Sequence, residues 1–177
     1  MNSFEIGILD FIRENLSCAV LDWFFPTITR FADHGIGWII TAIVLLCFKK
    51  TRKIGFSMGL ALIIGYLLGN MFLKNVIARM RPYDFAGGIE LLVEKLSDYS
   101  FPSGHTLCSF EGAFAVFIRN KKWGIAAIAF SSLIALSRLY LYVHYPSDVI
   151  AGALLGIAIA YLASFIIDKI STKKSAS

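Results

Sequence analysis

The sequence predicts an all-α protein, a polytopic bundle of transmembrane helices that forms one domain. Of its 177 residues, 57% are hydrophobic and only 16% are charged, and the mean hydropathy is +0.69. Soluble globular domains carry about half apolar and about a quarter charged residues, so this chain is too apolar for that class. Uncharged runs over residues 54–73 and 149–167 are each long enough for the roughly 20 residues that cross a bilayer core.

The elements follow one another along the chain as an amphipathic segment and a series of spans. Residues 3–16 place apolar side chains on one helical face, which is typical of an interfacial helix. Residues 17–32 contain Asp22, Pro26 and Arg30, so they form either an imperfect first span or a re-entrant segment. Five clearer spans cover residues 34–48, 54–73, 106–118, 123–143 and 149–167. We therefore expect six membrane helices within residues 1–170, followed by a disordered cytoplasmic tail at 171–177.

The positive charges gather at the ends of these spans. The net charge is +5, and Lys and Arg cluster at residues 49–53, 119–122 and 169–174. All three clusters fall on one side if the spans alternate in direction, and excess Lys and Arg in short loops marks the cytoplasmic side. We therefore expect a multi-pass protein of the cytoplasmic membrane. The excess of Lys and Arg is interpreted as a topology signal and not as a nucleic-acid-binding patch.

The opposite, outer side carries ionisable residues, which in a membrane are candidates for a functional site. The first group is KNVIARMRP, residues 74–82. Lys74 and Arg81 are seven residues apart, so a helix would place both on one face, where they would bind an anion. Arg79 would point about 200° away from Arg81, and we expect it to reach lipid headgroups.

The second group is FPSGHT, residues 101–106, which comes directly before the span over 106–118. Ser103 is a typical residue for a helix start, and Gly104 allows close approach of the backbone. The free N–H groups of a helix N-terminus attract anions. His105, in the first turn, would be placed to supply a proton, although a polar cap is the simpler interpretation of a lone histidine there.

The third group is SRLYLYVHYPSD, residues 137–148, between two very apolar runs. Arg138 ends one span, and His144 and Asp148 flank Pro146, which is expected to begin the next. This spacing lets the Asp148 carboxylate hydrogen-bond the His144 imidazole and support a nucleophilic or basic histidine. A purely structural His–Asp pair is the alternative. The GxxxG spacing of Gly152 and Gly156, just beyond, suits close helix packing.

Together the three groups read K-x6-RP, PSGH and SR-x5-H-x3-D, and with them the chain resembles the type 2 phosphatidic acid phosphatase (PAP2) superfamily. Every signature position is present between Lys74 and Asp148. The family includes integral-membrane lipid phosphatases and diphosphatases. The resemblance implies a metal-independent hydrolase in which His144 is the nucleophile that forms a phosphohistidine, Asp148 orients it, and His105 protonates the leaving oxygen. It also implies a phosphate-binding set consisting of Lys74, Arg81, Ser103, Gly104 and Arg138.

The position of these groups at the outer rim predicts that the substrate is a lipid phosphate or diphosphate of the extracytoplasmic leaflet. Small members of the family resemble bacterial cell-envelope enzymes that act on undecaprenyl diphosphate, phosphatidylglycerol phosphate or phosphatidic acid, and undecaprenyl diphosphate is the first expectation. A phosphotransferase that passes the phosphoryl group to an acceptor other than water is an alternative. A non-catalytic membrane protein that binds anionic lipids is another. The sequence gives no oligomeric state.

Three further expectations concern the surroundings of the site. Glu111, two turns inside the span over 106–118, either lines the substrate pocket or hydrogen-bonds a neighbouring helix. Residues 89–96 are expected to form a short interfacial helix, and Asp33 is interpreted as a helix-terminus residue. We expect no cofactor and no metal, because no carboxylate cluster suited to Mg²⁺ is present.

Overall fold

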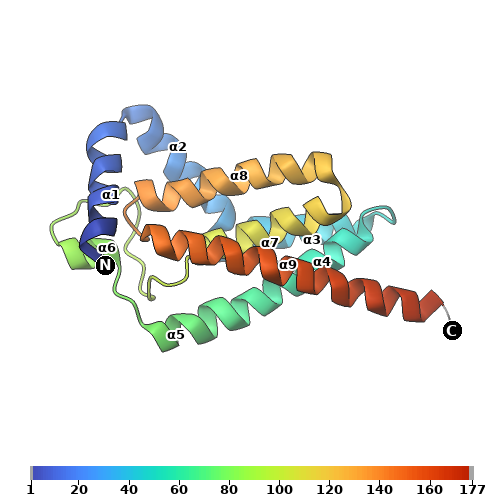
Figure 1. The fold of residues 1–177 in the computed structure, drawn as a ribbon. Helices are drawn as coiled ribbons and strands as arrows, with labels where there is room; N and C mark the ends of the chain where they lie inside the picture. The colour runs from blue at the N-terminus through green and yellow to red at the C-terminus, as the bar shows by residue number, and fades with distance from the viewer. Residues whose placement is uncertain (1, 176–177) are drawn as a thin grey trace.

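The structure is a computed structural model that describes residues 2–175 of the chain. Within this range every regular element is a helix, which confirms the predicted all-α bundle (Figure 1). The helices are α1 (Asn2–Leu16), α2 (Ala19–Thr29), the 3-10 helix η1 (Arg30–Gly35), α3 (Ile36–Cys47), α4 (Arg52–Gly65), the π-helix η2 (Tyr66–Leu73), α5 (Lys74–Ile77), α6 (Pro82–Ala86), α7 (Gly104–Arg119), α8 (Lys121–Tyr140) and α9 (Pro146–Ser175).

Among residues 2–175, four stretches are long and apolar enough to cross a membrane. They are Ala19–Cys47, Arg52–Ala86, Lys121–Tyr140 and Pro146–Lys173. Residues 17–32 hold α2 and the start of η1, and a kink separates α2 from α3 within the stretch Ala19–Cys47. The expected number of six membrane helices stays a prediction. The kink lies at His34 and Gly35, whose φ angles are 50° and 71°. The shorter α7, with 16 residues, completes the bundle.

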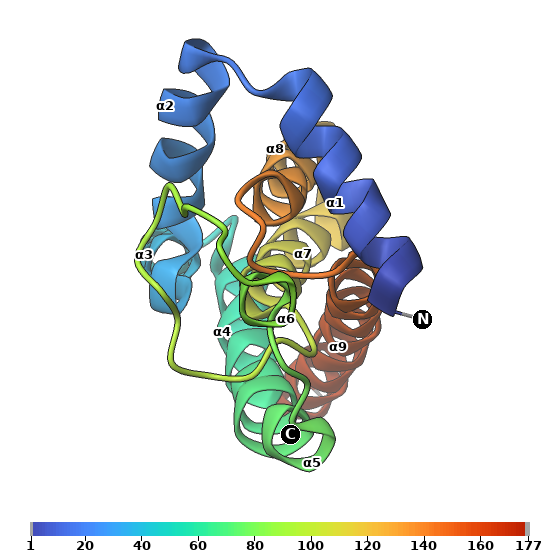
Figure 2. The same ribbon diagram turned by 90° about the vertical axis from the view of Figure 1, so that its left-hand side faces the viewer.

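Helix α7 lies in the middle of the bundle and packs against α4, α8 and α9 (Figure 2). Its contact with α9 depends on glycine. A Cβ at Gly152 would lie 2.8 Å from the Ser103 carbonyl oxygen, and one at Gly156 would lie 2.6 Å from that of Leu107. These two glycines let α9 approach the backbone of α7, and this approach brings the first turns of both helices together.

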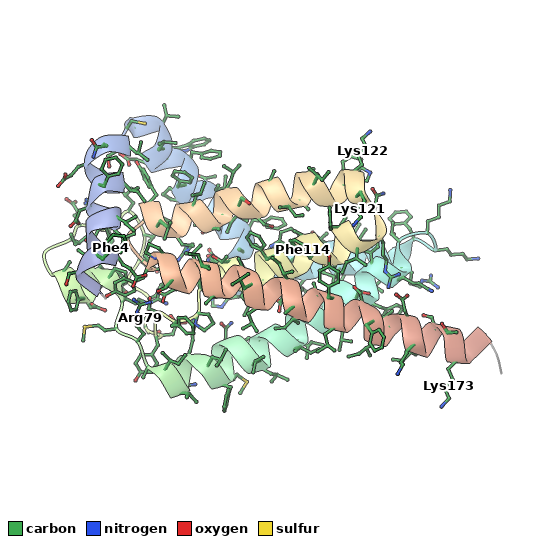
Figure 3. All side chains as sticks on the ribbon, viewed as in Figure 1. Phe4, Arg79, Phe114, Lys121, Lys122 and Lys173 are labelled. Carbon is green, nitrogen blue, oxygen red and sulfur yellow. The ribbon has the colours of Figure 1, made fainter. Side chains whose placement is uncertain are left out.

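The two ends of the bundle differ in charge and in shape. Helix α1 lies across one end, where Figure 3 labels Phe4 and Arg79, and the labelled Lys121, Lys122 and Lys173 lie at the other end. On α1, Leu9 is buried against the turn between α8 and α9, whereas Phe4 is 77% exposed. A helix is therefore present at residues 2–16, and its position in a membrane interface stays a prediction.

Two segments differ from the sequence-based expectation. Residues 87–99 form no helix, because Gly87 and Gly88 have φ angles of 68° and 67° and the chain then runs with alternate residues turned inward. Ile89, Leu91, Val93 and Leu96 pack against the apolar cluster under α1. Helix α9 continues to Ser175, where we expected disorder from residue 171, and the hydroxyls of Ser171 and Thr172 donate to carbonyls one turn back. Residues 176–177 of that expected tail lie outside the described range.

Candidate active site

A cavity of about 800 Å³ lies between the helices, with residues of η1, α3, α4, η2 and α7 in its wall. One part of its wall is polar and contains Lys74, Arg81, Asp98, His105 and His144. The rest is largely apolar and is formed by side chains of α3, α4 and η2, including Ile39, Ile43, Leu62, Ile63 and Leu67. A cavity with a cationic end and an apolar remainder suits an amphiphilic molecule with an anionic head.

His144 lies in the turn between α8 and α9 and is buried. Its Nε2 lies 3.3 Å from Arg81 Nη1, and its Nδ1 lies 3.4 Å from Ser100 Oγ and 3.6 Å from Asp148 Oδ2. Burial lowers the pKa of His144 well below its usual value, and the nearby Arg81 and Arg138 charges lower it further. The imidazole is therefore neutral at pH 7, which a nitrogen nucleophile requires.

Asp148 is fully buried in the first turn of α9. Its Oδ2 accepts from Ser100 Oγ at 2.5 Å and from the Tyr145 backbone N–H at 3.0 Å. At 3.6 Å the His144 contact is too long for a direct hydrogen bond, and the Ser100 hydroxyl is close to both side chains. The expected His–Asp pair is thus present as a three-residue cluster that includes Ser100, which the sequence-based reasoning missed.

Lys74 and Arg81 converge, but not by helical periodicity. Helix α5 ends at Ile77, Ala78 is left-handed with a φ of 47°, and Arg81 is extended. The expectation of one shared helix face is therefore wrong. Both cations instead bind the carboxylate of Asp98, Lys74 through Oδ2 and Arg81 Nη2 through Oδ1 at 2.6 Å. Burial raises the pKa of Asp98, but Lys74 and Arg81 outweigh this effect and lower it to about 2.

Arg138 and Ser103 lie behind the cavity wall. Arg138 is 2% exposed, its Nη1 donates to Thr29 Oγ1 at 2.7 Å, and no carboxylate of the described residues lies within salt-bridge distance of it. A buried cation that contacts no carboxylate directly favours an anion nearby. Ser103 caps α7 by accepting from Thr106 N–H, and Gly104 follows at the cavity wall, where a Cβ would lie 2.9 Å from Asn70 Oδ1.

The remaining wall residues include a second His–Asp pair. His105 Nε2 lies 2.7 Å from Asp33 Oδ1, and both residues line the cavity. Asp33 is therefore more than the helix-terminus residue that we expected, since it orients the His105 ring. Glu111 also lines the cavity, is 1% exposed, and its Oε1 has no hydrogen-bond partner among the described residues.

Arg79 does not reach lipid headgroups as we expected. Its side chain turns inward and pairs with Asp148 and with Glu5 of α1. No single-residue signal separated it from a surface cation, because its partners lie 69 and 74 residues away in sequence. Among residues 2–175, no three His, Cys, Asp or Glu side chains are grouped in a way that would hold a metal ion.

Comparison with known proteins places this geometry in a family. A family model of the PAP2 superfamily matches residues 50–171. An undecaprenyl-diphosphatase of Sulfolobus acidocaldarius is 42% identical over 160 residues, which cover 90% of this chain and 76% of that protein. The undecaprenyl-diphosphatase BcrC of Bacillus subtilis is 31% identical over 144 residues, covering 81% and 74%.

A solved structure gives the same result for the fold. The crystal structure of a transmembrane PAP2-type phosphatidylglycerolphosphate phosphatase from Bacillus subtilis superimposes with a TM-score of 0.76 at 26% identity. The match covers 95% of this chain and 86% of that one. The matched region contains all the signature residues from Lys74 to Asp148. The chain therefore belongs to the PAP2 superfamily.

Proposed function

We propose that this membrane phosphatase hydrolyses the phosphomonoester or diphosphate of a lipid at the extracytoplasmic face, through a phosphohistidine on His144 and without a metal ion. The observation that carries the proposal is the environment of His144. It is a buried, neutral imidazole whose Nε2 faces Arg81 at the cationic end of an otherwise largely apolar cavity. Such a site holds the phosphate beside a nucleophile while the lipid tail occupies the apolar part.

The proposed reaction has two displacements at phosphorus. In the first, the lone pair on His144 Nε2 forms the P–N bond as the bond from phosphorus to the leaving oxygen breaks, and His105 gives that oxygen a proton. In the second, His105 takes a proton from water, the water oxygen forms a bond to phosphorus, and the P–N bond breaks to release inorganic phosphate. The Lys74, Arg81 and Arg138 cations and the N–H groups at the start of α7 stabilise the charge on the phosphoryl oxygens.

The proposed orientation follows from the ends of the bundle. The candidate site lies at the α1 end, and the three Lys/Arg clusters belong to the opposite end, where Lys121, Lys122 and Lys173 lie (Figure 3). Short basic loops favour the cytoplasmic side, which supports an extracytoplasmic site in the cell membrane. The first substrate proposal is undecaprenyl diphosphate, supported by the names of the two related diphosphatases. Phosphatidylglycerol phosphate and phosphatidic acid are the next candidates.

A phosphate-release panel tests this function. Purified protein in detergent is given undecaprenyl diphosphate, phosphatidylglycerol phosphate or phosphatidic acid, and the inorganic phosphate released is measured over a range of substrate concentrations. We expect the highest kcat/KM with undecaprenyl diphosphate. A higher kcat/KM with either phospholipid would make that phospholipid the proposed substrate. No phosphate release with any of the three lipids would contradict the proposed function.

A further inference from the structure

Two charged residues outside the PAP2 signature, Glu5 and Arg79, contact the residues around His144. The Arg79 side chain is only 14% exposed. Its Nη1 donates to Asp148 Oδ1 at 2.5 Å and to Ser147 Oγ at 2.6 Å, and its Nη2 donates to Glu5 Oε2 at 2.6 Å. The guanidinium also lies over the Tyr145 ring, with Cζ 3.8 Å from the ring centroid. Arg79 therefore joins α1 to the first turn of α9.

Glu5 is placed in this contact by the inward face of α1. Its Oε1 accepts from the Ser147 backbone N–H at 2.9 Å, so it satisfies one of the free donors at the start of α9. Burial raises the pKa of Glu5, but the hydrogen bonds from Ser147 and Arg79 outweigh this effect and hold the pKa below its usual value. An ionised carboxylate is costly to bury unless it is paired. A helix that only rested on the membrane surface would not need a buried, ionised carboxylate.

Asp148 depends on Arg79 for its charge balance. The carboxylate is fully buried, and among the described residues Arg79 is the only Lys or Arg within salt-bridge distance of it. Arg79 binds the Oδ1 atom of Asp148. The other oxygen, Oδ2, accepts from Ser100 and from the Tyr145 N–H and faces His144. This division of the two oxygens fixes the rotation of the carboxylate, and with it the surroundings of His144 Nδ1.

We propose that Glu5 and Arg79 are positioning residues for the phosphoryl-transfer step, which hold Asp148, and through it His144, in the orientation for attack. The inference rests on the proposed function, because it assigns their role relative to His144 as the nucleophile. It makes the N-terminal helix part of the active-site framework: α1 supplies Glu5, Glu5 orients Arg79, and Arg79 orients Asp148.

The proposal predicts a lower kcat with little change in KM when these residues are replaced. Arg79 and Glu5 are not among the described residues that line the cavity, and the side-chain partners of Lys74 and Arg81 in the described part of the chain are Asp98, Tyr99, Val143 and His144. Loss of Arg79 therefore leaves the phosphate-binding cations in place but releases Asp148. We expect Arg79→Gln to lower kcat about 100-fold, the effect of a misplacement of roughly 1 Å, with little change in KM. Arg79→Lys, which keeps the charge but not the two-pronged geometry, should lie between Arg79→Gln and the wild type.

The experiment measures kcat, KM and the inhibition constant of inorganic phosphate for the wild type, Arg79→Gln, Arg79→Lys, Glu5→Gln and the double variant Glu5→Gln/Arg79→Gln. The substrate is the lipid that the wild type hydrolyses fastest among the three of the panel. Asp10→Asn is the matched control. Asp10 also lies on α1 and its Oδ1 accepts from Tyr142 Oη at 2.7 Å, so it ties α1 to the same turn through a different residue.

The expected result is a lower kcat in Arg79→Gln and a roughly tenfold lower kcat in Glu5→Gln, with KM and phosphate inhibition within about twofold of the wild type. The double variant should be no slower than Arg79→Gln alone, because both residues act through one carboxylate. Asp10→Asn should keep its kcat. If Arg79→Gln does not fold, Glu5→Gln, which replaces one carboxylate oxygen by an NH2 group, tests the same prediction of a lower kcat with unchanged KM.

Three results would overturn the proposal. Full kcat in both single variants would show that Asp148 needs neither residue. Weaker phosphate inhibition with unchanged kcat would make Arg79 a phosphate ligand instead. An equal loss of kcat in Asp10→Asn and Glu5→Gln would show that α1 acts only by packing against the bundle. Each of these is distinct from failure of the proposed function, in which the wild type itself would release no phosphate from any lipid of the panel.

Discussion

At the residue scale, the central observation is that the cations expected to bind phosphate are bound to a carboxylate of the chain itself. Asp98 lies in the segment between α6 and α7, its side chain is 51% exposed, and it contacts both Lys74 and Arg81. Its pKa of about 2 means that it stays ionised at neutral pH. We therefore expect a phosphate that enters the site to compete with Asp98 for these two cations.

The variant Asp98→Asn tests this competition. Removing the negative charge frees Lys74 and Arg81 for phosphate, and we expect inorganic phosphate to inhibit about tenfold more strongly, equivalent to about 1.4 kcal/mol. Inhibition constants of phosphate for the variant and the wild type provide the comparison. Asp84→Asn is the control, because Asp84 pairs only with Lys95, at 3.8 Å, among the described residues. Weaker inhibition in Asp98→Asn would mean that Asp98 organises the two cations and does not compete for them.

The sequence indicated the candidate site residues but not their contacts. Lys74, Arg81, His105, His144 and Asp148 stand in the spacings that carry the family resemblance. Asp98 and Ser100 lie in an irregular segment and Asp33 lies at the kink within η1, so no periodicity relates these residues to what they contact. The supposed shared face of Lys74 and Arg81 failed for a related reason. Ala78, a strong helix former, adopts a left-handed conformation here and ends the helix.

At the scale of elements, the site depends on the close approach of α7 and α9. The backbone N–H of Ser103 donates to the Asp148 carbonyl at 3.1 Å, so the start of each helix is tied directly to the other. The GxxxG spacing predicted close packing, and the structure shows which helix the glycines face. The segment over 87–99 could not be predicted in this way, because its apolar residues fit a helix as well as the extended path that Gly87 and Gly88 impose.

We expect Gly152→Val to separate the two helix starts. The added side chain would meet the Ser103 carbonyl, and overpacking of this kind costs about 1–3 kcal/mol. The variant should unfold at lower temperature in detergent and release phosphate more slowly than the wild type, which a thermal-unfolding assay and a phosphate assay measure. Gly7→Ala, on α1 with nothing within 4 Å of the added Cβ, is the control and should keep both properties. Wild-type stability and rate in Gly152→Val would contradict the dependence on this contact.

At the scale of the whole molecule, the bundle has one end with the candidate site and α1 and another with the basic clusters. Composition and charge were enough to predict a multi-pass membrane bundle with this polarity, because hydropathy and Lys/Arg bias act over whole segments. They were not enough to decide whether residues 17–32 form an imperfect span or a re-entrant segment, because Asp22 and Pro26 interrupt an otherwise apolar run. The structure places a kink at His34 and Gly35 between these residues and α3.

The orientation in the membrane is tested by thiol labelling in cells. In a background without Cys18, Cys47 and Cys108, a cysteine replacing Glu90 should react with a membrane-impermeant reagent added outside, and one replacing Lys50 should not. Both positions are exposed and lie in segments outside the long helices. Lysed cells, in which both cysteines should react, provide the control. The reverse pattern would place the candidate site on the cytoplasmic side.

The central claim is that His144 attacks phosphorus in a folded membrane phosphatase, and phosphate release by His144→Ala tests it most directly. The variant should keep the thermal unfolding of the wild type within a few degrees, because the polar contacts of the ring with Arg81, Ser100 and Asp148 are all 3.3 Å or longer. We expect its kcat for the best lipid substrate to fall at least about 1,000-fold, since removal of a nucleophile abolishes the covalent route. A folded His144→Ala protein that released phosphate at nearly the wild-type rate would contradict the account.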